Sequence, residues 1–275
     1  MGNTHEIQNG RNPVRDWFIP VATRVKPDIA KNQTAQGRYV VAADGTAYGF
    51  NNNRSVDRVL ALMDKSLAQF KANPPAKVEI SKDLLDAQAE VKTPEGASVV
   101  RFYTRIKPAP LGSDSSNANV NRDHFWILPD EAKALSKGEF PESLKYRLAR
   151  FALVDNVRGE PDHWRAAEVL QADFTAKPGR GFSVKLAGKF RMATADKARG
   201  YEGTFEGEAE VAPDGKLRGF KGIAEGEAWG RSTYTPNPPE GRFPLKIAFT
   251  LAGPGTPHVV HPQAVFYGRE YLTGR

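Results

Sequence analysis

Residues 201–211 alternate between two kinds of side chain, and this alternation constrains the fold more than any other feature of the sequence. Four of the five intervening positions are glutamate, and the other set is apolar or glycine: Tyr201, Gly203, Phe205, Gly207, Ala209 and Val211. Successive side chains of a β-strand point to opposite faces, so the segment is predicted to be a half-buried strand with an acidic outer side. The glycines remove volume from the apolar side, which is typical of a bend, a bulge or a closely approaching neighbour. The pattern therefore predicts a curved antiparallel sheet.

The segments on either side of this strand repeat the period of two. Alternating apolar positions occur over residues 170–174, 182–192 and 243–251. The apolar parity of residues 217–230 shifts near Phe220, which predicts a β-bulge. The alternation predicts about five strands, and no stretch long enough for a helix lies between them. We therefore expect a near-meander sheet that curls on itself, or closes into a barrel-like form, to hide its edges.

The first half of the chain carries turn and helix signals. Asp44-Gly45 lies between two apolar runs and predicts a hairpin over residues 38–50. Residues 17–22 are predicted to form a short apolar strand or edge segment, because Pro20 would interrupt a central strand. A helix is expected to begin at Ser55 and to end before Asn73-Pro74-Pro75, with one apolar face made of Val59, Leu60, Met63, Leu67 and Phe70.

A strand, a long exposed loop and two short helices are expected between the halves, at residues 99–106, 107–121, 129–137 and 141–153. Together the elements predict an α+β protein. Residues 1–75 form a small α/β segment, residues 76–98 a linker, and residues 99–275 a β-rich domain that carries the two helices.

Composition narrows the classes of function. The 275 residues include no cysteine, which excludes disulfides, thiolate metal sites and cysteine nucleophiles. The formal net charge is +7, but the basic residues do not cluster and no RNA-binding or zinc-finger signature occurs, so we expect no nucleic-acid partner. No apolar run reaches transmembrane length, and the N-terminus lacks a signal-peptide pattern. Phosphate-binding, dinucleotide-binding and common hydrolase motifs are absent, and no cofactor is predicted.

Parts of the sequence resemble a group of known proteins. The stretch VVAADGTAYGF and the helix after it look like the last third of a thioredoxin-like domain. The stretches RDHFWILPDEAKAL, FALVDNVRGEPDHW and GEAWGRSTYTP are similar to uncharacterised bacterial exported proteins, in which a thioredoxin-like part precedes a β-rich C-terminal domain. The resemblance implies a partial thioredoxin-like segment over residues 1–75. It also implies a periplasmic or extracellular location, the alternative being the cytoplasm. It implies no activity, and the missing Cys-x-x-Cys excludes dithiol redox chemistry.

Two segments offer groups for acid–base chemistry. His124 follows the long loop, where imidazole could act as a general base, although a strand that simply re-enters the core is the alternative. Asp155, Arg158 and His163 lie in one polar segment after the second helix and could form a binding or acid–base site. A helix cap by Asn156 and an ion pair between Arg158 and Asp162 would explain the same segment structurally.

Two further sets are candidates for binding. His258 and His261 are weak candidates for a metal site, since Pro257 and Pro262 argue against the helix that would bring the imidazoles together. The second set comprises aromatic residues next to the sheet glycines, which could line a small-molecule pocket: Tyr201, Phe205, Trp229 and Tyr234. The alternative is that the helix at 141–153 packs across this face and fills it.

These observations favour a non-enzymatic binding or accessory protein that uses a concave sheet and its loops to hold a small molecule, a glycan or a partner. The alternative is a cofactor-free enzyme with His/Asp/Arg acid–base chemistry near His124 and His163. A third hypothesis is binding of an anionic polymer by the +7 surface. The sequence carries no signal for the oligomeric state.

Overall fold

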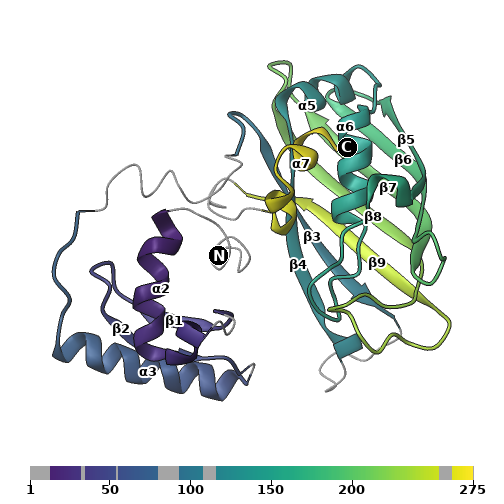
Figure 1. Cartoon of the computed structure of the whole chain (residues 1–275). Coiled ribbons are helices and arrows are strands. Elements are labelled where there is room, and N and C mark those ends of the chain that lie inside the picture. The colour runs from purple at the N-terminus through teal and green to yellow at the C-terminus, as the bar shows by residue number, and fades with distance from the viewer. Residues whose placement is uncertain are drawn as a thin grey trace. The chain divides into compact units, whose positions relative to one another are not determined.

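The computed structural model describes residues 13–31, 35–53, 55–79, 93–107, 116–253 and 262–274. The chain divides into two compact units, residues 1–90 (unit 1) and residues 91–275 (unit 2). Unit 1 combines helices with a two-stranded sheet, and unit 2 combines helices with a seven-stranded antiparallel sheet (Figure 1). The α+β class predicted from the sequence is therefore confirmed. Among the described residues, no helix has the length and apolar character needed to cross a membrane.

Unit 1 is built around the predicted hairpin. Strands β1 (Arg38–Val41) and β2 (Ala47–Asn51) pair antiparallel, and Gly45 takes the positive φ of +87° that the turn requires. Helices α2 (Pro13–Val25) and α3 (Val56–Ala72) both pack on β2, and a short 3₁₀ helix, η1 (Pro27–Lys31), follows α2. The predicted helix after Ser55 is confirmed as α3.

The prediction of a strand at residues 17–22 is wrong, because these residues lie inside α2. Phe18 and Ala22 are four residues apart and so share one helical face, which packs against Ile29 and Ala35. A short apolar run does not by itself distinguish a strand from a buried helical segment. Here the packing of that face decides in favour of the helix, although Pro20 lies in its interior.

The sheet of unit 2 contains seven strands in the order β4-β3-β9-β8-β7-β6-β5. Every pair of neighbours is antiparallel, as follows from their registers. The strands are β3 (Ser98–Ile106), β4 (Val120–Ile127), β5 (Val169–Pro178), β6 (Ser183–Ala193), β7 (Gly200–Val211), β8 (Leu217–Trp229) and β9 (Arg242–Leu251). The five strands expected after residue 165 are present, and β3 confirms the strand expected at 99–106.

The sheet is open, so the expected barrel-like closure does not occur. The edge of β4 is covered in another way. The Trp126 backbone N–H donates to the Tyr271 hydroxyl at 3.0 Å, and the Trp126 carbonyl accepts from Arg147 Nη1 at 3.1 Å. Tyr271 belongs to α7 (Arg269–Thr273), which follows the short 3₁₀ helix η5 (Gln263–Tyr267). Tyr271 of the C-terminal segment and Arg147 thus satisfy backbone groups of this edge strand without a barrel seam.

Helices cover one face of the sheet (Figure 1). Their apolar side chains share one buried core with those of the strands. The helices are α5 (Pro129–Ser136) and α6 (Glu142–Arg147), and α6 continues as one π-helical turn over Leu148–Ala152. The helix expected at 141–153 is therefore divided between two helix types. Single 3₁₀ turns occur at Ser116–Ala118 and Ala166–Glu168. The buried core between layers includes Phe102, Phe125, Phe174, Phe205, Phe249, Leu135, Leu144 and Leu148.

Strand β7 has the two faces that the alternation predicts. Phe205 is buried and Glu206 is exposed, and Ile247 of β9 is buried in the same core. The missing volume on the apolar side has two causes. A Cβ at Gly203 would lie 2.1 Å from the Glu225 backbone oxygen, and one at Gly207 would lie 3.1 Å from the Phe205 ring. The predicted bulge is also confirmed, because the β7–β8 register shifts between Glu210 and Val211.

Candidate functional site

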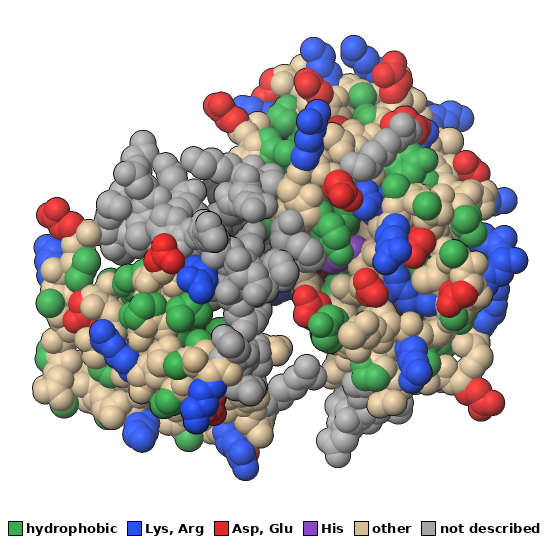
Figure 2. Space-filling view, viewed as in Figure 1, with side chains coloured by type: hydrophobic (Ala, Val, Ile, Leu, Met, Phe, Trp, Pro, Cys, Tyr) green, Lys and Arg blue, Asp and Glu red, His purple; other side chains and the backbone are tan. Residues whose placement is uncertain are grey.

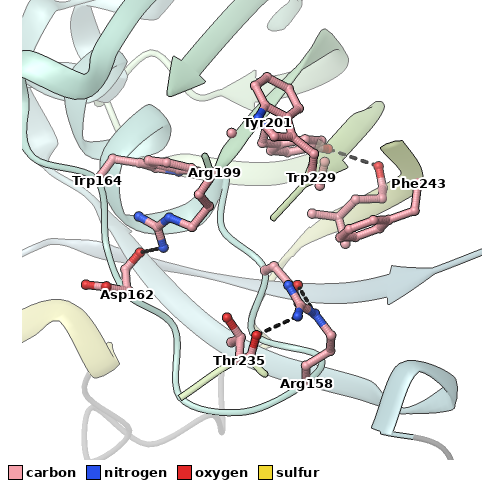
Figure 3. Close-up of a pocket in the computed structure, with 12 residues that line it drawn as sticks. Arg158, Asp162, Trp164, Arg199, Tyr201, Trp229, Thr235 and Phe243 are labelled. Atoms are coloured by element: carbon pink, nitrogen blue, oxygen red, sulfur yellow. Dashed lines mark hydrogen bonds and ion pairs between the residues drawn. The ribbon is translucent and has the colours of Figure 1, made fainter. Parts of the chain in front are cut away.

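A small pocket lies at one end of the unit 2 sheet. It is formed by the beginnings of β7 and β9, the end of β8, and the loops that precede β5 and β9 (Figure 3). Its free volume is about 20 Å³, enough for one or two water molecules. Its wall combines charged and aromatic side chains: Asp155, Arg158, Asp162, Trp164, Arg199, Tyr201, Trp229, Thr235, Phe243 and Leu245, with Gly200 and Ala228.

Arg158 holds the two loops together. Its Nε donates to Asp155 Oδ2 at 2.7 Å, and the same guanidinium donates to the carbonyls of Thr235, Pro236 and Gly230. The side chain is almost fully buried and also lies over the Phe243 ring, with 5.5 Å between its Cζ and the ring centroid. Arg158 and Asp155 therefore form a neutralised, hydrogen-bonded frame, whereas the structural alternative predicted an ion pair of Arg158 with Asp162 instead.

Arg199 has more unused donors than Arg158, because its guanidinium makes a single hydrogen bond among the described residues. Its guanidinium lies over the Trp164 indole, 4.0 Å from the ring centroid, and its Nη1 donates to the Asp162 carbonyl at 2.7 Å (Figure 3). Partial burial is the largest cause lowering the Arg199 pKa, and the nearby Asp162, Glu168 and Asp155 carboxylates oppose that shift. The indole contact and one backbone acceptor orient this side chain, and its other N–H groups have no acceptor among the described residues.

Trp229 forms the opposite part of the wall. Its indole lies under the Arg242 guanidinium at 4.2 Å, and its Nε1–H donates to the Lys197 carbonyl at 3.0 Å. Gly200 makes room for the ring, since a Cβ there would come within 2.0 Å of Trp229 Cζ2. The glycine at the start of β7 is therefore needed for the position of this wall.

His163 lies between Asp162 and Trp164 in the sequence, but unlike them it does not line the pocket. Its ring packs against Phe151 and Tyr267, with centroid distances of 5.6 Å and 5.3 Å. Burial is the largest cause that lowers the pKa of His163 to about 3, and Arg199 and Arg150 lower it further. The imidazole is consequently neutral at pH 7 and sits in an aromatic environment.

His124 lies on β4, outside the pocket lining. It is paired in register with Arg101 of β3, whose Nε donates to His124 Nε2 at 3.4 Å. Burial, followed by Arg101 and Arg122, lowers the His124 pKa to about 4. The neighbouring Asp123 accepts the backbone N–H groups of His124 and Gln263, while burial raises its pKa to about 7.

The four acid–base candidates therefore do not meet at one opening among the described residues. Asp155 and Arg158 line the pocket, whereas His124 and His163 do not. The aromatic candidates also separate. Tyr201 and Trp229 line the pocket, and the Tyr201 hydroxyl donates to the Leu245 carbonyl at 3.0 Å. Phe205 is part of the filled core, where its ring packs against Phe174 and Phe249, and Tyr234 is 62% exposed on its loop.

The two metal candidates, His258 and His261, lie outside the described residues. Within the described parts of the chain, no group of three or more His, Cys, Asp or Glu side chains is arranged to hold a metal ion.

Sequence reasoning missed Arg199 as a pocket residue. It belongs to no motif, and it is placed by the Trp164 indole, which comes from another part of the chain. The signal that does exist is the concentration of polar residues at 155–164, which correctly indicated one of the two loops at the pocket. Comparison of the chain with protein-family models, curated proteins and solved structures finds no match.

Proposed function

We propose that the chain is a non-enzymatic binding protein and that its pocket holds an oxygen-rich ligand group, a sugar hydroxyl cluster or a carboxylate. The observation that carries the proposal is the arrangement of Arg199, which is oriented on Trp164 with donors to spare at the pocket mouth. A guanidinium held in this way loses little further freedom when it donates to an oxygen acceptor.

The chemistry of the remaining wall fits the same ligand class. Trp229, Tyr201 and Phe243 provide apolar surface, and the exposed Asp162 carboxylate provides acceptors. Binding sites commonly combine such aromatic lining with a few placed polar groups. The free volume of about 20 Å³ suits a single inserted polar group, so the rest of the ligand would lie on the loops at the rim.

The hydrogen bonds of Arg158 also support the proposal, because they hold the loops of the pocket in place. Three hydrogen bonds from one buried guanidinium join the loop before β5 to the loop before β9, and a fourth holds the guanidinium on Asp155 of its own loop. Loops fixed before the ligand arrives do not have to be ordered on binding, which preserves affinity.

A thermal-shift screen with mono- and disaccharides in one arm and small carboxylates in the other tests the proposal. A ligand should raise the melting temperature with concentration, and Arg199→Gln should remove that rise. Arg218→Gln is the matched control, because Arg218 is exposed and ion-paired with Asp214 away from the pocket. Carboxylate binding should weaken with added salt, whereas sugar binding should not. No shift in either arm, or a shift that persists in Arg199→Gln, would reject the proposal.

A second function is favoured by a different observation. Arg101, Arg105 and Arg122 lie on the outward side of β3 and β4, around Tyr103, and their strands pair in register there. No Asp or Glu occurs among the described outward residues of β3, β4 and β9, since Asp123 lies on the Phe102 side. The positive surroundings contribute to the low pKa of His124. We propose this surface as the place where an anionic polymer would bind.

Retention on heparin tests the second function. The wild-type chain should elute at higher salt than an Arg101→Gln/Arg122→Gln variant, because fewer counterions would be released by the variant. The control variant Lys216→Gln/Arg218→Gln changes two exposed basic residues elsewhere on the molecule. It has the same net charge as Arg101→Gln/Arg122→Gln, but it should elute like the wild type. Equal elution of all three proteins would reject this surface.

A further inference from the structure

Helix α3 carries an apolar stripe that the described residues of unit 1 leave exposed. The side that packs on β2 includes Leu62 and Ser66, which lie close to Gly49. Five other apolar side chains are between 43% and 69% exposed: Val56, Leu60, Met63, Leu67 and Phe70. An exposed apolar row of this length on a helix of a small unit is unusual and is typical of an interaction surface.

The spacing of the stripe indicates what kind of surface covers it. The five positions follow one another at intervals of four, three, four and three residues. This mean interval of 3.5 residues is the period of the seam between two helices packed as a coiled coil, not that of a helix lying on a sheet. The occupant is therefore another helix with a similar apolar row.

The charged residues beside the stripe indicate that the second helix is another copy of α3. Asp57, Asp64 and Lys71 are seven residues apart and lie on the flank of the stripe that is turned away from β2. When two such helices run antiparallel, these flanks face each other, and Asp57 of each copy lies near Lys71 of the other. In a parallel pair the same flank would face the side that already packs on β2, where no opposite charge is available among the described residues.

We propose that two copies of the chain associate through α3, antiparallel, with Leu60 opposite Phe70 and Met63 opposite Leu67 across the two-fold axis. Asp64 then lies near its own symmetry mate, which weakens the pair at its centre. Each copy contributes only a few seam residues, well below the roughly 20 residues per side of a standard interface. The association is therefore weak, with a dissociation constant on the order of 10 μM to 1 mM.

Sedimentation equilibrium of the full chain over a range of concentrations tests the association. The wild type should approach dimer mass as concentration rises, and Leu60→Glu should remain monomeric. Leu170→Glu is the matched control, because Leu170 is 55% exposed, like Leu60, but lies on β5. Equal monomer mass for wild type and both variants at all concentrations would overturn the proposal, as would loss of dimer in Leu170→Glu alone.

Cross-linking tests the orientation and does not depend on a variant that disrupts the seam. The chain has no cysteine, so a single introduced thiol reports one position. Oxidised Asp64→Cys should form a disulfide-linked dimer, since antiparallel pairing brings this position close to its mate. Lys65→Cys, one residue along and on the outer side of the helix, should stay monomeric under the same conditions. Efficient cross-linking of Lys65→Cys, or none of Asp64→Cys, would contradict the antiparallel pair.

Discussion

Buried arginines connect the helical layer of unit 2 to the edge of its sheet. Arg147 is fully buried, forms an ion pair with Glu131 at 2.7 Å, and donates to the carbonyls of Trp126, Tyr271 and Leu272. Glu131 also accepts the Leu128 backbone N–H at the start of α5. The pair therefore links α5, α6, β4 and α7, and a guanidinium is suited to this because its donors form a fixed planar fork.

Removing that guanidinium should destabilise unit 2 strongly. Arg147→Met leaves the Glu131 carboxylate buried without its partner, and the free energy of unfolding should fall by about 3–5 kcal/mol. Urea denaturation followed by circular dichroism measures the change. Adding Glu131→Gln should recover part of the loss, because the unpaired charge is then gone. Lys145→Ala removes a partly exposed ion pair with Glu142 on the same helix and should cost about 1 kcal/mol or less. Similar losses for Lys145→Ala and Arg147→Met would contradict this role.

The buried imidazole of His163 should make stability fall with acid. Its pKa is about 3 in the folded chain and 6.5 ordinarily, so between these values the unfolded chain binds a proton that the folded chain does not. Stability is therefore full above pH 6.5 and decreases as the pH falls toward 3. His163→Phe keeps an aromatic ring beside Phe151 and should reduce the loss between pH 7 and pH 5 by about 2 kcal/mol. Urea unfolding at both pH values measures this difference.

Asp123 changes the pH dependence of stability in the opposite direction to His163. The His163→Phe variant is therefore compared with the wild type at each pH. Its folded pKa is raised from 3.8 to about 7, so its contribution is full below pH 3.8 and is lost as the pH rises through 7. The substitution at residue 163 leaves this contribution in place. Identical pH profiles for wild type and His163→Phe would show that the imidazole is not buried in its neutral form.

Among the elements, the β7–β8 pair depends on its glycines. Gly203 and Gly226 are directly paired, and a Cβ on either would lie about 2 Å from a backbone oxygen of the other strand. Gly226→Ala should therefore cost about 3 kcal/mol or more of unfolding free energy, since backbone must move. Gly219→Ala, in the same strand, meets only the Glu210 side chain at 3.3–3.4 Å and should cost much less. Chemical denaturation of both variants checks this, and equal costs would contradict a close approach at Gly226.

The elements also show which parts of the fold sequence reasoning can reach. Strands with one wet and one dry face, such as β7, leave a period of two, and the Asp44-Gly45 turn leaves a local signature. The helix at residues 17–22 leaves neither, because its pattern is short and its identity is decided by packing against Ile29 and Ala35. The prediction of a closed barrel was wrong for a related reason. The edge of β4 is covered by Tyr271, 145 residues away in the chain, and no local pattern reports such a contact.

At the scale of the whole molecule, the two units should differ in stability. The described core of unit 1 is small, with Ala22, Ile29 and Ala35 buried beneath a two-stranded sheet, which is marginal by itself. Unit 2 has a continuous core beneath seven strands. Urea should therefore unfold unit 1 first. Of the four tryptophans only Trp17 lies in unit 1, so Trp17→Phe should remove the early step from fluorescence and leave it in circular dichroism. A single coincident transition would contradict this.

The candidate site was only partly accessible from sequence because it is assembled from distant segments. Tyr201 and Trp229 were identified through the glycines around them, and Asp155 and Arg158 through their polar segment. Arg199 and Asp162 meet across 37 residues and through a backbone oxygen, a contact that side-chain identity does not encode. The charged patches visible in Figure 2 are likewise mixed in sign over much of the surface, so net charge alone does not locate a site.

The most direct measurement of the binding proposal is the position of ligand-induced changes in a ¹⁵N NMR spectrum. The saccharides and carboxylates of the thermal screen would be titrated into labelled protein, with the indole N–H signals of Trp164 and Trp229 and the Arg199 Nε–H assigned by substitution. We predict that the largest saturable shifts occur at Arg199 and the two indoles, while Trp126, which is buried beside Tyr271, stays unchanged. Saturable shifts confined to other residues, or none with any ligand, would contradict it.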